Sequence, residues 1–143
     1  MTQQTNIKGL SHITFMCKDL EKTSQFLKEI FSAEEIYSSG DSTFSISKEK
    51  FFRIAGLWDA IMEGESVDKS YNHIACQVNE SDLSILEDRI KSLGLTILPG
   101  RKRNKSEGKS LYFYDYDNHL FEFHTGNLKT RLTIYNRDRN IVR

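Results

Sequence analysis

Short β-prone runs and helical stretches alternate along the first half of the chain. Residues 11–17 form an apolar run that is typical of a strand, and Asp19 then offers a helix N-cap. Over residues 20–31 the apolar positions recur at spacings of three and four, which predicts a helix. Turns are predicted at Gly40 and at the charged cluster of residues 48–50. They separate three further strand candidates, at residues 35–38, 42–47 and 51–62.

The second half of the chain repeats this order. Residues 72–78 are strand-like, and Ser81 is placed to cap a helix whose apolar positions recur from residue 83 to residue 93. Gly94 follows at the position where a left-handed residue commonly ends a helix. Three more strand candidates complete the half, at residues 95–98, 109–116 and 120–125.

The repeat predicts the fold class. When His12 is aligned with His73, both halves consist of a strand, a helix and then several strands, which indicates an internal duplication. Each βαβββ module has too few residues to bury its own sheet, so we expect an α+β fold in which two modules form a cup-shaped mixed sheet around a shared cavity. Leu128, Leu132 and Tyr135 lie at helical spacing and predict a last helix. The predicted bounds are residues 1–143 for a single domain, about 8–65 and 70–126 for its modules, and 127–143 for a C-terminal tail.

Composition restricts the partners and the location. Lys+Arg and Asp+Glu both number 20, so the chain has no net charge that would favour nucleic acid or an acidic membrane. The two cysteines, Cys17 and Cys76, form no CxxC pair and are too few for a disulfide framework. The first ten residues lack the apolar stretch of a signal peptide, and no apolar run approaches the ~20 residues that cross a bilayer. We therefore predict a cytoplasmic location with reduced thiols.

Two histidines and a glutamate are the candidate metal ligands. His12 and His73 hold equivalent places in the first strand of each half, so pseudo-symmetry would bring them together. Glu122 lies in the apolar run Leu-Phe-Glu-Phe-His, where strand alternation puts it on the same face as His124. A carboxylate buried there needs a cation or an arginine to offset the cost of burial. Two imidazoles and one carboxylate suit Mn, Fe, Co, Ni or Zn and leave coordination positions open.

Other interpretations of these residues remain open. The histidines are equally compatible with two core residues, and Glu122 with a residue that faces a dimer partner. The positions in the first half that correspond to Glu122 are Ala60 or Ile61, so no fourth ligand is expected there. Asp59 is adjacent to them and is the one residue that could change this count.

Several segments closely resemble the fosfomycin-resistance proteins of the vicinal oxygen chelate superfamily. Among those proteins the resemblance is to the epoxide hydrolase branch, known as the FosX type, and it extends from about Gly9 to Leu132. The superfamily pairs βαβββ modules around a divalent metal. The segments that carry the resemblance are Gly-Leu-Ser-His-Ile-Thr at 9–14, Ser-Ser-Gly-Asp at 38–41, residues 44–52, Ile-Ala-Gly-Leu-Trp at 54–58, Tyr-Asn-His-Ile-Ala at 71–75, and residues 112–122.

The resemblance implies a metal site and a reaction. The family's metal ligands fall on His12, His73 and Glu122, and the metal is usually Mn(II), which holds the oxirane oxygen and a phosphonate oxygen of fosfomycin. Glu49 matches the general base that takes a proton from water as the water attacks the epoxide carbon, although a glutamate within Lys-Glu-Lys would otherwise be read as a solvated turn residue. Thr14 matches a threonine near the oxirane oxygen.

The resemblance also implies how substrate and subunits are arranged. Trp58 matches an aromatic wall of the pocket. Family members are homodimers with paired modules across chains, so His12 of one subunit is expected to join His73 and Glu122 of the other. The candidates for phosphonate contacts are Lys102 or Arg103, Ser106, Ser110, Tyr112 and Arg131.

Three other functions compete with hydrolysis by water. The loop at residues 104–110 looks more like the branch that transfers glutathione, and a thiol transferase using glutathione or bacillithiol is the first alternative. The second alternative is another metal-dependent enzyme of the same fold, such as an Fe(II) ring-cleaving dioxygenase. The third is a drug-binding module without catalysis, which the candidate metal ligands argue against.

Overall fold

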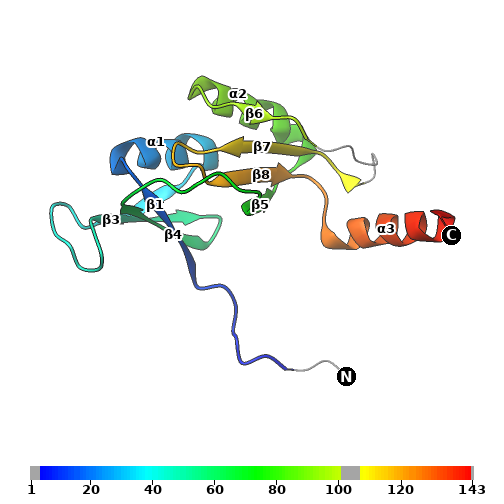
Figure 1. The fold of residues 1–143 in the computed structure, drawn as a ribbon, viewed down its shortest axis with the longest axis horizontal. Coiled ribbons are helices and arrows are strands. Elements are labelled where there is room, and N and C mark those ends of the chain that lie inside the picture. Colours follow the sequence, from blue (N-terminus) through cyan, green and yellow to red (C-terminus); the bar gives the residue numbers. More distant parts are fainter. Residues whose placement is uncertain (1–3, 101–106, 143) are drawn as a thin grey trace. The chain divides into compact units, whose positions relative to one another are not determined.

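The computed structural model describes residues 4–100 and 107–142, with side chains up to residue 139. The chain divides into two compact units, Met1–Glu65 and Ser66–Arg143, and each is described by itself. Each unit contains one four-stranded mixed sheet, and the ribbon in Figure 1 traces the strands of both.

The first unit is a βαβββ module. Its elements are β1 (His12–Cys17), α1 (Leu20–Phe31), β2 (Glu34–Ser38), β3 (Glu49–Ile54) and β4 (Leu57–Glu63). The strand order is β1-β4-β3-β2, with β1 parallel to β4 and the other pairs antiparallel. The first strand of the module, β1, and its last strand, β4, therefore lie side by side.

Helix α1 forms as the spacing of its apolar residues predicts. The carboxylate of Asp19 accepts a hydrogen bond from the backbone N–H of Lys22 at 3.0 Å, which confirms the predicted N-cap. The helix buries Phe26, Leu27 and Ile30, and it packs against β2, β3 and β4. The helix predicted from the sequence and the observed helix thus begin and end at the same residues.

Three predictions in residues 42–62 were wrong. Residues 42–47 contain no strand, since residues 44–47 form bends, and Glu49 and Lys50 belong to β3 and not to a turn. The single strand predicted at 51–62 is a hairpin, because Ala55 and Gly56 have positive φ angles of 46° and 85° and turn the chain back. Two consecutive residues with positive φ match the twist of a two-residue hairpin, and the apolar residues on both sides hid the turn.

The second unit repeats the module and adds two helical elements. Its elements are β5 (His73–Gln77), the 3-10 turn η1 (Glu80–Asp82), α2 (Leu83–Ser92), β6 (Ile97–Leu98), β7 (Ser110–Tyr114), β8 (Leu120–His124) and α3 (Leu128–Val142). The strand order is β5-β8-β7-β6, which matches the first unit strand for strand. The α+β fold of two βαβββ modules is therefore confirmed.

The helix ends of the second unit agree only in part with the sequence. Ser81 lies inside η1, and α2 begins at Leu83 without a side-chain cap, so the predicted Ser81 cap was wrong. Gly94 follows α2 with a φ of 74°, as predicted. The strand predicted at 95–98 is reduced to Ile97–Leu98.

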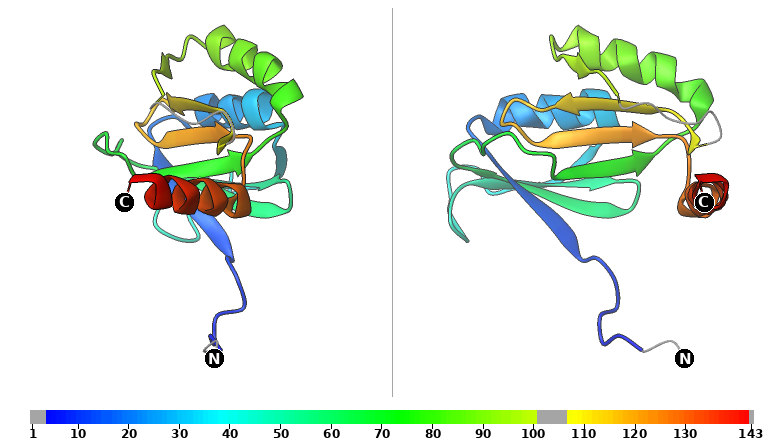
Figure 2. Two further views of the ribbon diagram at one scale, coloured as in Figure 1. Left: turned by 90° about the vertical axis from the view of Figure 1, so that its right-hand side faces the viewer. Right: turned by 45° about the vertical axis from the view of Figure 1, so that its right-hand side comes forward.

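The core of the second unit is aromatic. Phe113 is fully buried, with its ring centroid 5.8 Å from that of Phe121 and 5.3 Å from that of Phe123. The predicted last helix is present as α3, and Figure 2 shows it following β8 after a short connection. Of its apolar residues, Leu128 is exposed whereas Ile134 is buried. None of the helices in the described ranges combines the length and apolar character that a membrane crossing requires.

Candidate metal and substrate site

One face of the second sheet carries most of the candidate residues of that unit. Residues paired across neighbouring strands point to the same side of a sheet. Two such rows cross β5, β8 and β7: Ala75, Glu122 and Tyr112 in the first, and Gln77, His124 and Ser110 in the second. Glu122 and His124 thus share a face, as strand alternation predicted.

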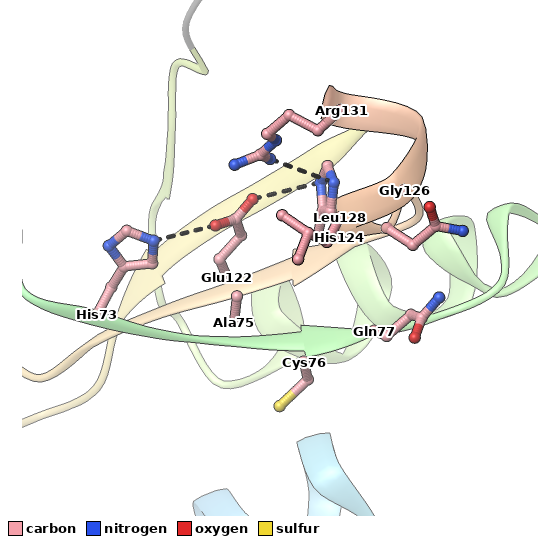
Figure 3. A pocket seen from close by; sticks show the side chains of 10 residues that line it. His73, Ala75, Cys76, Gln77, Glu122, His124, Gly126, Leu128 and Arg131 are labelled. Carbon is pink, nitrogen blue, oxygen red and sulfur yellow. Dashed lines mark hydrogen bonds and ion pairs between the residues drawn. The ribbon is translucent and has the colours of Figure 1, made fainter. Parts of the chain in front are cut away.

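A cleft of about 320 Å³ opens on this face. It is lined from β5 by His73, from β8 by Glu122 and His124, and from the first turns of α3 by Leu128 and Arg131. Figure 3 shows contacts that join His73 to Glu122, Glu122 to His124 and His124 to Arg131. The cleft therefore contains two predicted metal ligands and one predicted phosphonate contact.

His73 and Glu122 form the centre of the cleft. His73 Nε2 lies 3.1 Å from Glu122 Oε1, and Glu122 is only 4% exposed. The other ring nitrogen, His73 Nδ1, lies 2.7 Å from the carbonyl oxygen of Tyr71. Because a carbonyl oxygen can only accept, Nδ1 carries the proton, and the neutral ring presents its lone pair at Nε2.

The donor set of this pair fits a divalent metal. In the neutral ring, an imidazole lone pair and a carboxylate oxygen face each other at hydrogen-bond distance, and the two repel unless a proton or a cation lies between them. A histidine that donates its second N–H to a backbone carbonyl is the usual arrangement of a metal ligand. Within the described residues, no group of three His, Cys, Asp or Glu side chains is arranged to hold a metal by itself.

A chain of hydrogen bonds ends on the second oxygen of Glu122. The Ser110 hydroxyl donates to Glu122 Oε2 at 2.5 Å, and Ser110 Oγ also lies 2.7 Å from His124 Nδ1. The guanidinium of Arg131 donates to His124 Nε2 at 3.3 Å. Ser110 and Arg131, predicted as phosphonate contacts, are therefore connected to a predicted metal ligand. His124 was not among the predicted site residues, although its place on the Glu122 face was the signal for it.

Tyr112 lies beside this pair in the same row as Glu122. Its hydroxyl accepts a hydrogen bond from that of Tyr71 at 3.4 Å, and its ring centroid is 5.7 Å from that of His73. Tyr71 thus contacts both His73, through its carbonyl oxygen, and Tyr112, through its hydroxyl. This arrangement places the phenol ring of Tyr112 beside the ring of a predicted metal ligand.

In the first unit, His12, Thr14 and Trp58 share one face of the sheet. His12 pairs with Trp58 in the register of β1 and β4, and their rings stack with centroids 4.2 Å apart. Thr14, two residues along β1, pairs with Ala60. The hydroxyl of Ser11 lies 2.9 Å from His12 Nδ1. His12 and Thr14 are both exposed on this face and so are accessible to a ligand.

Glu49 lies on the same face of the first sheet. It is the first residue of β3 and pairs with Met62, two residues beyond Ala60 on β4. Its backbone is bound twice by one residue, since its N–H donates to Ser39 Oγ at 3.0 Å and its carbonyl oxygen accepts from the Ser39 N–H at 3.0 Å. Glu49 is 8% exposed and Ser39 is 9% exposed. The structure therefore places Glu49 in a buried, fixed segment and not in a solvated turn.

Comparison with known proteins identifies the family. Residues 9–123 match the model of the Glyoxalase/Bleomycin resistance protein/Dioxygenase superfamily. The chain is 63% identical to the fosfomycin resistance protein FosX of Listeria innocua, over 92% of this chain and 99% of that protein. It belongs to the FosX family of fosfomycin-resistance proteins. A metallothiol transferase, FosB of Lysinibacillus sphaericus, is only 34% identical, over 93% of both chains.

Solved FosX structures share the fold. A crystal structure of a FosX variant from Listeria monocytogenes, complexed with Mn(II) and 1S,2S-dihydroxypropylphosphonic acid, matches with a TM-score of 0.83 and 55% identity, over 90% of this chain and 98% of that chain. FosX from Mesorhizobium loti matches with a TM-score of 0.80 and 47% identity, over 89% and 98%.

Two further predictions about this FosX-family site have different outcomes. Asp59 pairs with Ile13 and Phe52 and is 3% exposed, so it lies on the buried face of the first sheet, opposite His12. Asp59 is therefore not a further metal ligand beside His12, because strand alternation directs its side chain to the opposite face of the sheet. Lys102, Arg103 and Ser106 lie outside the described residues, so their role as phosphonate contacts stays a prediction.

The buried face of β3 carries an ion-pair cluster behind Glu49. Lys50 Nζ lies 2.8 Å from Glu21 Oε1 and 3.2 Å from Glu35 Oε1. The hydrogen bond with Glu21 raises the pKa of Lys50, against the opposing effect of burial, and Glu35 raises it further. Burial alone would raise the pKa of Glu35, but hydrogen bonds with Lys50 and then Lys28 lower it overall. These contacts hold the start of β3 against α1 and β2.

Proposed function

We propose that this chain hydrolyses the epoxide of fosfomycin to a diol with the help of Mn(II), and so confers fosfomycin resistance. The observation that carries the proposal is the facing pair of His73 Nε2 and Glu122 Oε1, 3.1 Å apart, in a chain of the FosX family. The FosX structure with Mn(II) contains a dihydroxypropylphosphonic acid, which has the composition of an epoxypropylphosphonic acid plus one water. Such a product requires no thiol.

The metal would be held by His73 and Glu122 together with His12. We propose a homodimer with paired modules across chains, in which His12 of the partner subunit completes the site. In this dimer, the first sheet of one subunit and the second sheet of its partner would form a cup around one cavity. A bound Mn(II) supplies a Lewis acid that stabilises negative charge on the ring oxygen. Three protein ligands leave positions for the substrate.

The residues of this chain would carry the proton transfers and the binding of substrate. The Glu49 carboxylate takes a proton from water while the water oxygen forms a bond to one epoxide carbon and the bond from that carbon to the ring oxygen breaks. The ring oxygen then takes up a proton from solvent and becomes the second hydroxyl, and Glu49 returns its proton to solvent. Thr14 would contact the ring oxygen, and Trp58 would form a wall beside the substrate.

The phosphonate would be bound by cations and hydroxyl groups. Arg131 borders the cleft and Tyr112 lies beside its central pair, and they supply one guanidinium and one hydroxyl. Ser110 was a third predicted contact, but its hydroxyl proton is directed at Glu122. Lys102 or Arg103, with Ser106, would add to this set. We further propose the cytoplasm as the location, on the composition of the chain.

Product analysis tests the proposal. Fosfomycin is incubated with the protein and Mn(II), with and without glutathione or bacillithiol, and the products are followed by phosphorus NMR. Diol formation without thiol is the expected result. Turnover that requires thiol would replace the proposal by a thiol transferase, and oxygen consumption with catechols would point to a dioxygenase.

Variants test the role of Glu49 separately. Glu49→Gln should lower the rate of diol formation by roughly 10²–10⁴-fold, the usual contribution of a general base, and leave Mn(II) binding intact. Glu34→Gln, on the exposed strand β2, is the matched control and should retain the parent rate. Retained hydrolysis by Glu49→Gln would remove Glu49 from this role.

A further inference from the structure

His124 links helix α3 to a predicted metal ligand and has no role in the function proposed above. It lies in β8, two residues after Glu122, and is 9% exposed. Its two ring nitrogens both have polar neighbours, Ser110 Oγ at 2.7 Å from Nδ1 and Arg131 Nη2 at 3.3 Å from Nε2. The ring therefore lies between a guanidinium and a hydroxyl.

The partners of His124 determine the direction of every hydrogen bond in the chain. A guanidinium only donates, so His124 Nε2 accepts and, in the neutral ring, Nδ1 carries the proton. Nδ1–H then donates to Ser110 Oγ, and the hydroxyl proton of Ser110 is left to donate to Glu122 Oε2 at 2.5 Å. All donors in the series from Arg131 to Glu122 point toward the carboxylate.

The opposite tautomer would disrupt this series. With the proton on Nε2, the ring would face the donors of Arg131 with another donor, and Nδ1 would compete with Glu122 for the Ser110 proton. A direct contact cannot replace the bridge through Ser110, because His124 Nδ1 is 3.5 Å from Glu122 Oε2, which is long for a hydrogen bond. Arg131 therefore selects the tautomer that lets Ser110 bind the carboxylate.

We propose that His124 is a positioning residue for the metal ligand Glu122. By keeping Ser110 as a donor to Oε2, it orients the carboxylate so that Oε1 points at His73 Nε2, 3.1 Å away. Hydrogen bonds in series polarise one another, so part of the positive charge of Arg131 is felt at Glu122. The inference rests on the proposed function, because it takes His73 and Glu122 as metal ligands.

Three substitutions of His124 test the roles of its two ring nitrogens one at a time. The amide nitrogen of Asn can stand where Nδ1 stands and donate to Ser110, whereas the amide of Gln reaches the position of Nε2. His124→Phe removes both. Loss of a residue that orients a metal ligand commonly costs 10–100-fold in affinity. We therefore expect His124→Phe and His124→Gln to bind Mn(II) at least tenfold more weakly than the parent, and His124→Asn to stay within about threefold.

The affinity is measured on metal-free protein by titration with Mn(II), with free Mn(II) followed by electron paramagnetic resonance. His119→Asn is the control, since His119 also bonds a carboxylate through Nδ1, that of Asp115 at 2.8 Å, but in the turn between β7 and β8. It should bind Mn(II) as the parent does.

Two outcomes would overturn the inference. One is that all three His124 variants bind Mn(II) within twofold of the parent. The other is that His124→Asn and His124→Gln lose affinity for Mn(II) equally, which would refute the fixed direction of the hydrogen bonds from Arg131 to Glu122. Should the Phe variant fail to fold, as judged by circular dichroism, the comparison of Asn with Gln decides. A parent protein that binds Mn(II) but forms no diol would overturn the proposed hydrolysis and leave this inference standing.

Discussion

Replacing Ser39 with alanine tests whether the fixed backbone of Glu49 matters. The Ser39 side chain accepts one hydrogen bond, from the N–H of Glu49 at 3.0 Å, and both residues are buried. Ser39→Ala removes the acceptor and leaves a buried N–H without its partner, which costs about 1–3 kcal/mol. The second bond, from the Ser39 N–H to the Glu49 carbonyl oxygen, involves only backbone atoms and remains.

Ser38→Ala is the matched control for this change. The Ser38 hydroxyl also accepts from a backbone N–H, that of Gly40 at 3.2 Å, but the site is exposed and water can take its place. Its loss should cost no more than about 0.5 kcal/mol. For a chain of 143 residues, one kcal/mol corresponds to a few degrees in Tm, so Ser39→Ala should melt several degrees below Ser38→Ala.

Activity provides the functional half of the Ser39 test. A small displacement of a catalytic group can cost as much as 10²-fold in rate, so kcat for fosfomycin hydrolysis by Ser39→Ala should fall by roughly tenfold or more. Binding of Mn(II) should not change, and Ser39→Thr, which keeps a hydroxyl, should restore most of the rate. Equal melting temperatures and equal kcat values for Ser39→Ala and Ser38→Ala would refute the reasoning.

Four further predictions address the two units. The pKa of Glu35 is lowered in the fold, so its contribution to stability is present above its ordinary pKa of 4.5 and is lost as the pH falls through the lower folded value. In urea titrations, the difference in the free energy of unfolding between the parent and Glu35→Gln should therefore disappear in acid. The pKa of Lys50 is raised, so its contribution to stability is present below its ordinary pKa of 10.5 and is lost as the pH rises through the higher folded value. The difference in the free energy of unfolding between the parent and Lys50→Met should therefore disappear in alkali. For either residue, a difference that does not change with pH would contradict the prediction. Phe113→Ala should lower the free energy of unfolding by about 3–5 kcal/mol, read from urea midpoints, because the ring is fully buried. His73→Ala should weaken Mn(II) binding at least tenfold in a calorimetric titration, and unchanged affinity would remove His73 from the ligand set.

The periodic pattern of the sequence predicted the elements whose neighbours are local. Apolar spacing located α1, and Asp19 caps it within one turn. Aligning His12 with His73 predicted two modules, and both sheets have the same strand order. Alternation along β8 correctly placed His124 on the face of Glu122. Each of these predictions depends on residues within a few positions of one another or on a repeat.

Features that depend on distant contacts could not be predicted in this way. Lys50 looks like a surface residue in the sequence, yet it is buried because Glu21 and Glu35 approach it from α1 and β2. The tautomer of His124 depends on Arg131, which α3 brings to the ring. No local pattern encodes either contact, since the partners belong to elements whose packing the sequence does not state.

The separation of the two carboxylates between the units has an evolutionary consequence. Ser39 fixes Glu49 within the first unit, and Ser110 binds Glu122 within the second. With the roles proposed above, substitutions around Glu49 can alter what attacks the substrate while His73 and Glu122, which would bind the cation, stay unchanged. On this view, a lineage that exchanges one nucleophile for another needs to remodel only one of its duplicated halves.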